Sequence, residues 1–279
     1  TEKPEGQRGR DVPRPYTVEP PLGIDPKDWQ AQYYEAGQRF AFGLTLFAQA
    51  LNLFPYLVVA MPLMGQGGIG VPLEENAPLD RPGWRQRGQF VLRRIDALNT
   101  LTGEVAPLMG EGQTMVHMPD VPVSDQDIIA ASRSLLDQMG EAGLVQIHFR
   151  TPMRIIDGGR LAHQPWLGPL FRRLLERLDA LRGEYAGEPP VPDRERLIAR
   201  ADRVRLVQDF SRWADVQSRS RRLGRSTPVG GYLGVATYQA AADTWQALLP
   251  LLLWGQEVHV GNKNGKGDGW YRVSVPEGG

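Results

Sequence analysis

Leu144-Val-Gln-Ile-His-Phe-Arg150 alternates apolar with polar side chains, and this stretch decides the fold of the second half of the chain. Such alternation is typical of a strand with one buried face. A helix follows over Pro165–Arg182, where leucines recur at helical spacing. The later pattern predicts a short helix over 193–201, strands over 204–216 and 230–239, a helix over 241–254, and short strands over 257–261 and 270–275.

The first half of the chain repeats part of this order of elements. The alternation in Arg39–Leu46 predicts a half-buried strand, and a helix is expected over Ala48–Met64. A glycine-rich loop at Gly65–Gly70 and a strand over Gln89–Leu98 complete half of a ferredoxin-like unit. Ser124 is a good N-cap for a helix that extends to about residue 139, because Asp127 follows it three residues later.

The predicted fold class is therefore α+β, with two tandem ferredoxin-like (RRM-like) domains and a C-terminal glycine-rich loop. We expect a flexible lead-in over residues 1–14 and a first, incomplete domain over residues 15–125. A connecting helix is expected over residues 126–142, and the second domain with its glycine-rich loop over residues 143–279.

Composition excludes several classes of protein. The chain has no cysteine, and its four histidines lack the paired spacing of a zinc site, so no metal or other cofactor is expected. The longest apolar stretch, Leu44–Met64, is interrupted by Asn52, Pro55 and Pro62, so we expect no membrane segment. Residues 1–14 lack the apolar core of a signal peptide. A cytoplasmic protein is compatible with these features.

The charges are unevenly distributed along a chain whose net charge is zero. Residues 1–150 carry five more acidic than basic side chains, whereas residues 151–226 carry six more basic than acidic ones. This asymmetry is consistent with a basic face on a neutral protein, although scatter explains it equally well.

An arginine-rich run lies inside the basic segment, at Arg219-Ser-Arg-Arg-Leu-Gly-Arg225. Guanidinium groups bind phosphate in a bidentate manner, and each contact with a nucleic-acid backbone releases a counterion. The other interpretation is a solvated turn between strands, which is the usual fate of a charge run. Candidate RNA-binding residues in this run are Arg219, Arg221, Arg222 and Arg225.

A second candidate is the C-terminal glycine-rich loop, Gly261-Asn-Lys-Asn-Gly-Lys-Gly-Asp-Gly269. Glycine permits close approach or positive φ, and Lys263 and Lys266 supply positive charge. The loop does not match a phosphate-binding P-loop or a dinucleotide-binding fingerprint. Trp270 and Tyr271, which follow the loop, could stack on bases or pack in the core, and at least one of them is expected in the core. The candidate RNA-binding residues are Gly261, Lys263, Gly265, Lys266, Gly267 and Gly269.

The ordered motifs of the chain resemble those of the CRISPR precursor-RNA-processing endoribonucleases of the RAMP superfamily. The similar segments are Pro15–Pro21, Gly37–Leu46, Phe54–Tyr56, Gly65–Gly70, Phe149–Arg154, Pro228–Tyr238, Leu249–Leu253 and His259–Gly261. Each segment is short, but together and in this order they span 13–275. Residues 1–14 do not resemble the strand–helix segment in which family members often carry their catalytic histidine. In the glycine-rich loop, the lysine that follows the first glycine in the family is shifted to a later position here.

The resemblance implies that the chain binds CRISPR repeat RNA and cleaves it without a metal, by attack of a 2′-hydroxyl on the adjacent phosphate. The alternative is a non-catalytic subunit that retains guide RNA within a CRISPR effector complex. Other effector subunits are thus expected partners. His259 is the titratable group nearest to the loop and is the candidate acid or base, while the competing interpretation is that it packs structurally.

Overall fold

The computed structural model describes residues 12–21, 33–70, 86–113, 115–215, 217–220, 225–228, 230–261 and 263–276. Contacts between Cα atoms divide the chain into two units, one of residues 49–127 and one of residues 1–48 together with 128–279. Residues 15–48 therefore group with the C-terminal part, whereas the sequence pattern placed them in the first domain.

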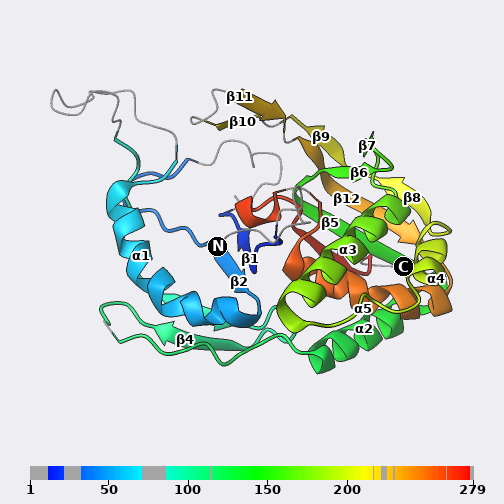
Figure 1. The fold of residues 1–279 in the computed structure, drawn as a ribbon, viewed down its shortest axis with the longest axis horizontal. Coiled ribbons are helices and arrows are strands. Elements are labelled where there is room, and N and C mark those ends of the chain that lie inside the picture. The colour runs from blue at the N-terminus through cyan, green and yellow to red at the C-terminus, as the bar shows by residue number, and fades with distance from the viewer. Residues whose placement is uncertain are drawn as a thin grey trace, which may run out of the picture. The chain divides into compact units, whose positions relative to one another are not determined.

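The larger unit contains a sheet whose neighbouring strands are all antiparallel, in the order β13-β5-β12-β8. Its elements follow one another as β5 (Leu144–Met153), α3 (Leu167–Leu181), β8 (Arg205–Asp209), β12 (Gly231–Gln239), α5 (Ala242–Val258) and β13 (Tyr271–Ser274). This βαββαβ order, with the first and third strands in the centre, is the ferredoxin-like arrangement. The two helices lie on one face of the sheet (Figure 1). The second predicted domain thus has the expected topology.

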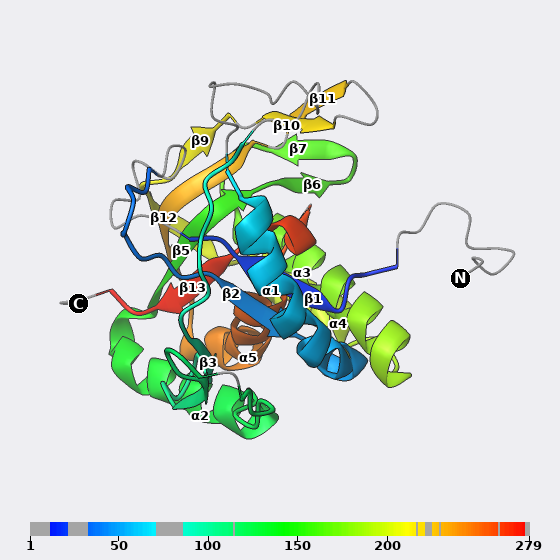
Figure 2. The ribbon, with the colours of Figure 1, turned by 90° about the vertical axis from the view of Figure 1, so that its left-hand side faces the viewer.

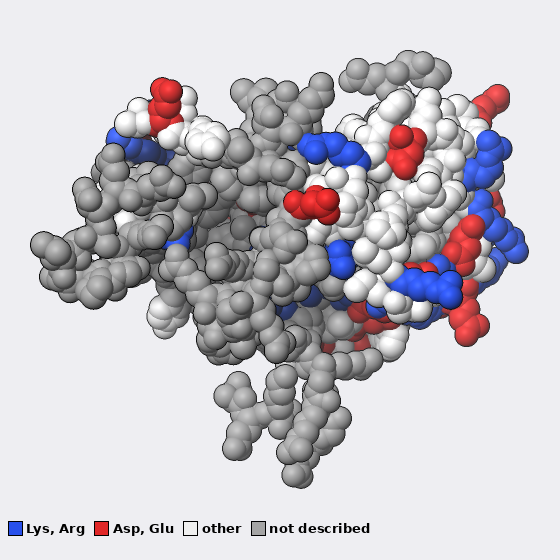
Figure 3. Space-filling model, turned by 90° about the horizontal axis from the view of Figure 1, so that it is seen from above, with Lys and Arg blue, Asp and Glu red and all other residues white. Residues whose placement is uncertain are grey.

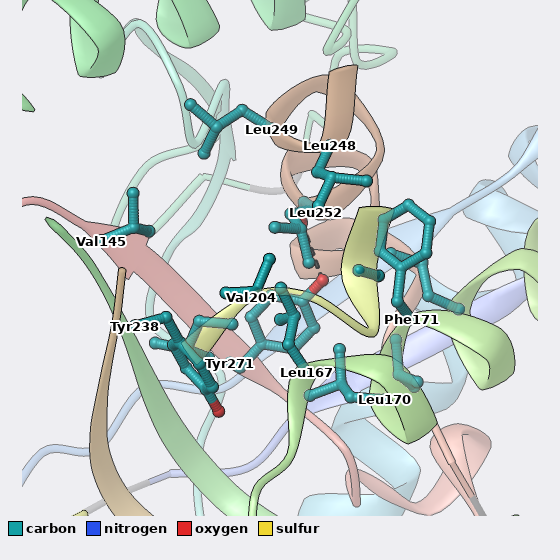
Figure 4. Close-up of a cluster of buried hydrophobic side chains, with 14 of the residues drawn as sticks. Val145, Leu167, Leu170, Phe171, Val204, Tyr238, Leu248, Leu249, Leu252 and Tyr271 are labelled. Atoms are coloured by element: carbon teal, nitrogen blue, oxygen red, sulfur yellow. Dashed lines mark hydrogen bonds between the residues drawn. The ribbon is translucent and has the colours of Figure 1, made fainter. Parts of the chain in front are cut away.

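The core of this unit forms where the helices meet the apolar face of the sheet. Val145, Ile147 and Phe149 of β5 are buried in it, as the alternation of this strand predicts. Leucines of α3 and α5 pack onto them, and the Tyr271 hydroxyl donates a hydrogen bond of 2.8 Å to the carbonyl of Leu252 (Figure 4). Tyr271 therefore belongs to the core, as was expected of one of the two aromatic residues after the loop.

Smaller elements surround this sheet. β1 (Tyr16–Glu19) and β2 (Gly43–Leu46) pair antiparallel, as do β6 (Ile155–Asp157) and β7 (Arg160–Ala162). β9 (Arg212–Ala214) pairs with the start of β12. The remaining elements are α2 (Asp125–Met139), a 3-10 turn at Gly140–Ala142, a π-helical turn at Arg182–Ala186, α4 (Arg194–Ala201), β10 (Gln217–Ser220), β11 (Arg225–Pro228) and a 3-10 turn at Asn264–Lys266. In Figure 2, β9 runs beside the start of β12.

The predicted cap of α2 is confirmed. The backbone N–H of Ser124 donates to Asp127 Oδ2 at 2.8 Å, and the N–H of Asp127 donates to Ser124 Oγ at 3.3 Å. These reciprocal bonds are those of a capping box, with aspartate in the position that glutamate or glutamine usually takes.

Two predictions for the C-terminal half were wrong. The strand expected over 257–261 is instead the last turn of α5 followed by the start of the loop. Two side chains of its last turn bond to β13. Gln256 accepts a hydrogen bond from the N–H of Val273, and Glu257 accepts one from Arg272, so these contacts favour continuation of the helix. The strand expected over 204–216 is divided into β8 and β9 at Phe210–Ser211, where Asp209 accepts bonds from Ser211.

The smaller unit has a 3-10 helix at Ala48–Leu53, α1 (Phe54–Gly67) and the antiparallel pair β3 (Ile95–Leu98) and β4 (Val105–Met109). The predicted loop at Gly65–Gly70 begins later, because α1 continues to Gly67, and only the end of the strand predicted over Gln89–Leu98 forms. Ala48–Gly67 is long and apolar enough to cross a membrane by length and composition, contrary to expectation, because the helix continues through Pro62. A single helix of this kind is weak evidence for membrane insertion.

Candidate nucleic-acid interface

The two ends of the arginine-rich run lie on paired strands, called the arginine hairpin below. β10 and β11 pair antiparallel, with Arg219 opposite Ser226 and Ser220 opposite Arg225. Arg221 and Arg222 lie outside the described residues, and so do the side chains of Arg219 and Arg225. Only the backbone of the two strands is therefore placed, with Arg219 on β10 and Arg225 on β11.

The glycine-rich loop is held by the protein's own backbone. Gly261 and Gly269 have positive φ of 96° and 79°. A side chain at Gly269 would meet the carbonyl oxygen of Val260 at 1.9 Å, and the N–H of Gly269 donates to the carbonyl of Pro152 at 3.1 Å. These two positions therefore require glycine because of close internal packing.

The middle of the loop packs on the N-terminal segment of the same unit. A Cβ on Gly265 would lie 2.7 Å from the Arg14 side chain, and one on Gly267 would lie 3.2 Å from both Pro20 and the carbonyl of Val18. The sequence predicted close approach at these glycines, and the approach is to the segment that contains β1.

The two lysines of the loop differ in exposure. Lys266 is exposed and Lys263 is partly buried. Lys263 has a left-handed backbone, with φ of 64°, a conformation that is uncommon for residues with a side chain. Burial and the nearby charges of Lys266 and Arg154 lower the pKa of Lys263. The loop therefore crowds cations together, an arrangement that an anionic ligand would stabilise.

Asp268 is a titratable group in this loop that the sequence pattern did not single out. Desolvation by burial raises the pKa of its carboxyl to about 6, against the opposing effect of Lys263 and Lys266. A carboxyl with such a pKa changes charge near neutral pH, so the net charge of the loop depends on pH in this range.

Arg154 joins the two predicted RNA-binding segments. Its Nη1 donates a hydrogen bond of 3.0 Å to the carbonyl of Gly230, where the chain leaves the hairpin and enters β12. Its own carbonyl oxygen lies 2.7 Å from the position of a Cβ on Gly261, at the start of the loop. Within the described residues, Arg154 forms no ion pair with an acid. In the sequence, Arg154 stands out only as the last residue of the Phe149–Arg154 motif, because its neighbours do not indicate these contacts.

His259 lies beneath the loop and not on its surface. Its side chain is 0% exposed, its φ is 54°, and both ring nitrogens are buried. Burial, and to a smaller extent Arg272 and Arg177, lower its pKa to about 3. The ring stacks on Trp270 with 6.3 Å between centroids and 17° between planes. A neutral, enclosed imidazole of this kind supports packing more than proton transfer.

Ion pairs tie the N-terminal strand to the sheet beside the loop. Arg272 of β13 donates to Glu257 at 3.1 Å and to Glu19 of β1 at 3.3 Å. Arg272 and Arg150 also lie over the Trp270 ring, at 5.4 and 5.6 Å from its centroid. This network fixes β1, on which the glycines of the loop pack.

The rest of the described surface gives little further indication of a site. On the face shown in Figure 3, basic and acidic side chains are intermixed wherever the residues are described. No three His, Cys, Asp or Glu side chains gather as a metal site would require, among the residues whose placement is given. The loop, Arg154 and the hairpin are therefore the candidate interface.

Comparison with family models gives two matches. Residues 147–271 match the model of the CRISPR-associated endoribonuclease Cas6. Residues 1–121 match a second model, described as an N-terminal domain. No curated protein matches the chain.

Several solved structures are similar to this chain. Thermus thermophilus Cas6 aligns over 93% of this chain and 78% of its own, with 14% identity and a TM-score of 0.49. A product complex of the same Cas6 aligns over 93% of this chain and 82% of that chain, with 18% identity and a TM-score of 0.51. A partial Cas6-RT-Cas1–Cas2 complex aligns over 94% of this chain and 39% of that chain, with 14% identity and a TM-score of 0.56.

At these identities the solved structures support the fold alone, whereas the family model identifies the C-terminal part. The Cas6 match begins inside β5 and ends at the first residue of β13, so it coincides with the ferredoxin-like unit. The resemblance seen in the sequence is thereby confirmed for the C-terminal part of the chain, in which residues 147–271 match the model of the CRISPR-associated endoribonuclease Cas6.

Proposed function

We propose that the chain binds CRISPR repeat RNA at the glycine-rich loop and the arginine hairpin, and cleaves it to produce guide RNA. The observation that supports this most is Arg154, which contacts the hairpin return at Gly230 and the loop at Gly261. The backbone that leaves the arginine hairpin and the start of the glycine-rich loop, which lie far apart in the sequence, therefore both contact Arg154. Such a cluster suits an RNA backbone, because cations that neutralise phosphates release bound counterions.

The proposed reaction needs no metal. The 2′-oxygen attacks the adjacent phosphorus while a base takes its proton, and the 5′-oxygen leaves with a proton from an acid. The products are a 2′,3′-cyclic phosphate and a 5′-hydroxyl. Lys263, Lys266 and Arg154 supply positive charge that stabilises the pentacovalent phosphorane.

A second candidate function is RNA retention without cleavage, in complex with other CRISPR proteins. The burial of His259 favours it, because the only acid or base proposed from the sequence does not reach the loop surface. The structural relatives include a Cas6-RT-Cas1–Cas2 complex, which supports further CRISPR subunits as partners. We place either activity in the cytoplasm.

One experiment separates the two functions. RNA that copurifies with the full chain is sequenced, resynthesised and incubated with the protein in EDTA. The endoribonuclease cleaves this RNA, and a single 2′-deoxy substitution at the scissile nucleotide abolishes cleavage. Binding without cleavage selects the retention function. Cleavage of the 2′-deoxy substrate, or a requirement for magnesium, contradicts the mechanism, and the absence of any RNA binding contradicts both functions.

A further inference from the structure

An aromatic pair adjoins the cation cluster. His163, directly after β7, lies on Trp213 of β9 with 4.9 Å between ring centroids and 42° between planes. His163 is exposed, and Trp213 is partly buried against the core. In Figure 1, β7 and β9 lie at the upper right. The outer ring of the pair therefore faces solvent while the inner ring is fixed.

The pair is connected to Arg154 through a single residue. A Cβ on Gly230 would lie 3.2 Å from Nε1 of Trp213, and the carbonyl of Gly230 accepts the hydrogen bond of Arg154. Trp213 is further held by a bond of 3.1 Å from its Nε1 to Asp215. Arg154, Gly230, Trp213 and His163 thus follow one another, and the start of the loop at Gly261 lies against the backbone of Arg154.

Cations followed by an open aromatic ring are the two components of a single-strand binding track. The cations attract the backbone, and an unpaired base stacks on the ring whatever its identity. We propose that the His163–Trp213 pair stacks an unpaired nucleobase of the RNA strand whose phosphates lie on Arg154 and the loop lysines. This inference rests on the proposed RNA binding. The competing explanation is that His163 only ties the end of β7 to β9.

The test uses the full chain and the resynthesised copurifying RNA, in a set with one abasic nucleotide moved along the strand. One abasic position should weaken binding to the wild type by roughly 5- to 150-fold, the usual range for a stacked base. His163→Ala should weaken binding of the intact RNA by the same factor and show no further loss at that abasic position. His163→Phe should restore binding, and Gln164→Ala, at the exposed neighbouring residue, should behave as the wild type.

Three outcomes would overturn the inference. The first is that His163→Ala binds all RNAs as the wild type does. The second is that the fold-loss in affinity from His163→Ala multiplies with the fold-loss from every abasic position. His163 then contacts no single base. In the third, His163→Ala lowers the melting temperature and His163→Phe does not restore binding, so that the pair is a structural tie. In each case the wild type still binds RNA, and the proposed function stands.

Discussion

The guanidinium of Arg154 donates a hydrogen bond to the carbonyl of Gly230, at 3.0 Å, and so joins the end of β5 to the return of the arginine hairpin. Removal of this side chain should weaken RNA binding about 10-fold or more, because a charge-assisted phosphate contact contributes ~1.5–3 kcal/mol. The slope of log affinity against log salt should fall by roughly 0.7–0.9, the value for one phosphate contact.

Titration of labelled RNA at several salt concentrations measures both quantities for Arg154→Ala. Arg196→Ala is the matched control, since Arg196 is an exposed arginine on α4 that is not part of the cluster. An unchanged slope for Arg154→Ala would show that Arg154 only fastens Gly230.

The arginine run provides a second, separable contribution. Replacement of Arg219, Arg221, Arg222 and Arg225 together should weaken binding and flatten the salt dependence by roughly 0.7 for each phosphate of a single strand that is no longer neutralised. The same titration series measures it. Charge-preserving replacement of all four by lysine should keep most of the slope and reduce the affinity, because lysine does not form bidentate contacts. If the alanine variant keeps the wild-type slope, the run is a solvated turn.

Asp268 should make RNA binding depend on pH. Its pKa is raised to about 6, so between pH 7.5 and 5.5 the carboxylate becomes neutral and the loop more positive. Binding to the wild type should strengthen over this range, and Asp268→Asn should bind at pH 7.5 as the wild type does at pH 5.5. Fluorescence anisotropy at fixed ionic strength measures this. Equal pH dependence in both proteins would exclude Asp268 as the cause.

The same group contributes to stability with a defined sign. The folded pKa of Asp268 lies above its ordinary value of 3.8, so the folded state binds the proton more tightly than the unfolded state. The contribution of Asp268 to the free energy of unfolding is therefore fully present below pH 3.8 and is lost as pH rises through about 6. Asp268→Asn should raise the free energy of unfolding at pH 7.5 and change it little at low pH.

The sequence predicted the elements that local pattern determines. The alternation in Leu144–Arg150 identified β5, and Ser124 with Asp127 identified the start of α2, because burial on one face and capping depend on neighbouring residues. The end of α5 was missed, because Gln256 and Glu257 find their partners on β13. Such long-range contacts leave no periodic signal.

The candidate site was foreseen in part for the same reason. The glycines and lysines of the loop can be recognised from the sequence alone. The positive φ predicted for its glycines is found at Gly261 and Gly269. Arg154 acquires its place from the register of β5 against β12, and the burial of His259 follows from the turn at the end of α5. Neither can be read from the flanking residues.

His259 should prove to be a supporting residue of the loop. Its ring is 0% exposed and stacked on Trp270, so His259→Phe, which keeps an aromatic ring there, should retain RNA binding and whatever cleavage the wild type shows. His259→Ala should lower the free energy of unfolding by roughly 2–4 kcal/mol, as loss of a large buried side chain does. An acid or base would behave otherwise: both variants would keep binding and lose at least about 100-fold in cleavage rate.

The pH dependence of stability gives an independent check on His259. The pKa of His259 in the folded state is lowered to about 3, so between this value and about pH 6.5 the unfolded state binds a proton that the folded state does not. The free energy of unfolding therefore falls as pH drops from 6.5 towards 3. Denaturant titrations should show this fall in the wild type and a smaller one in His259→Phe. An equal fall in both would show that His259 is protonated in the folded protein, and a cleavage defect in a stable His259→Phe would restore it as the catalytic candidate.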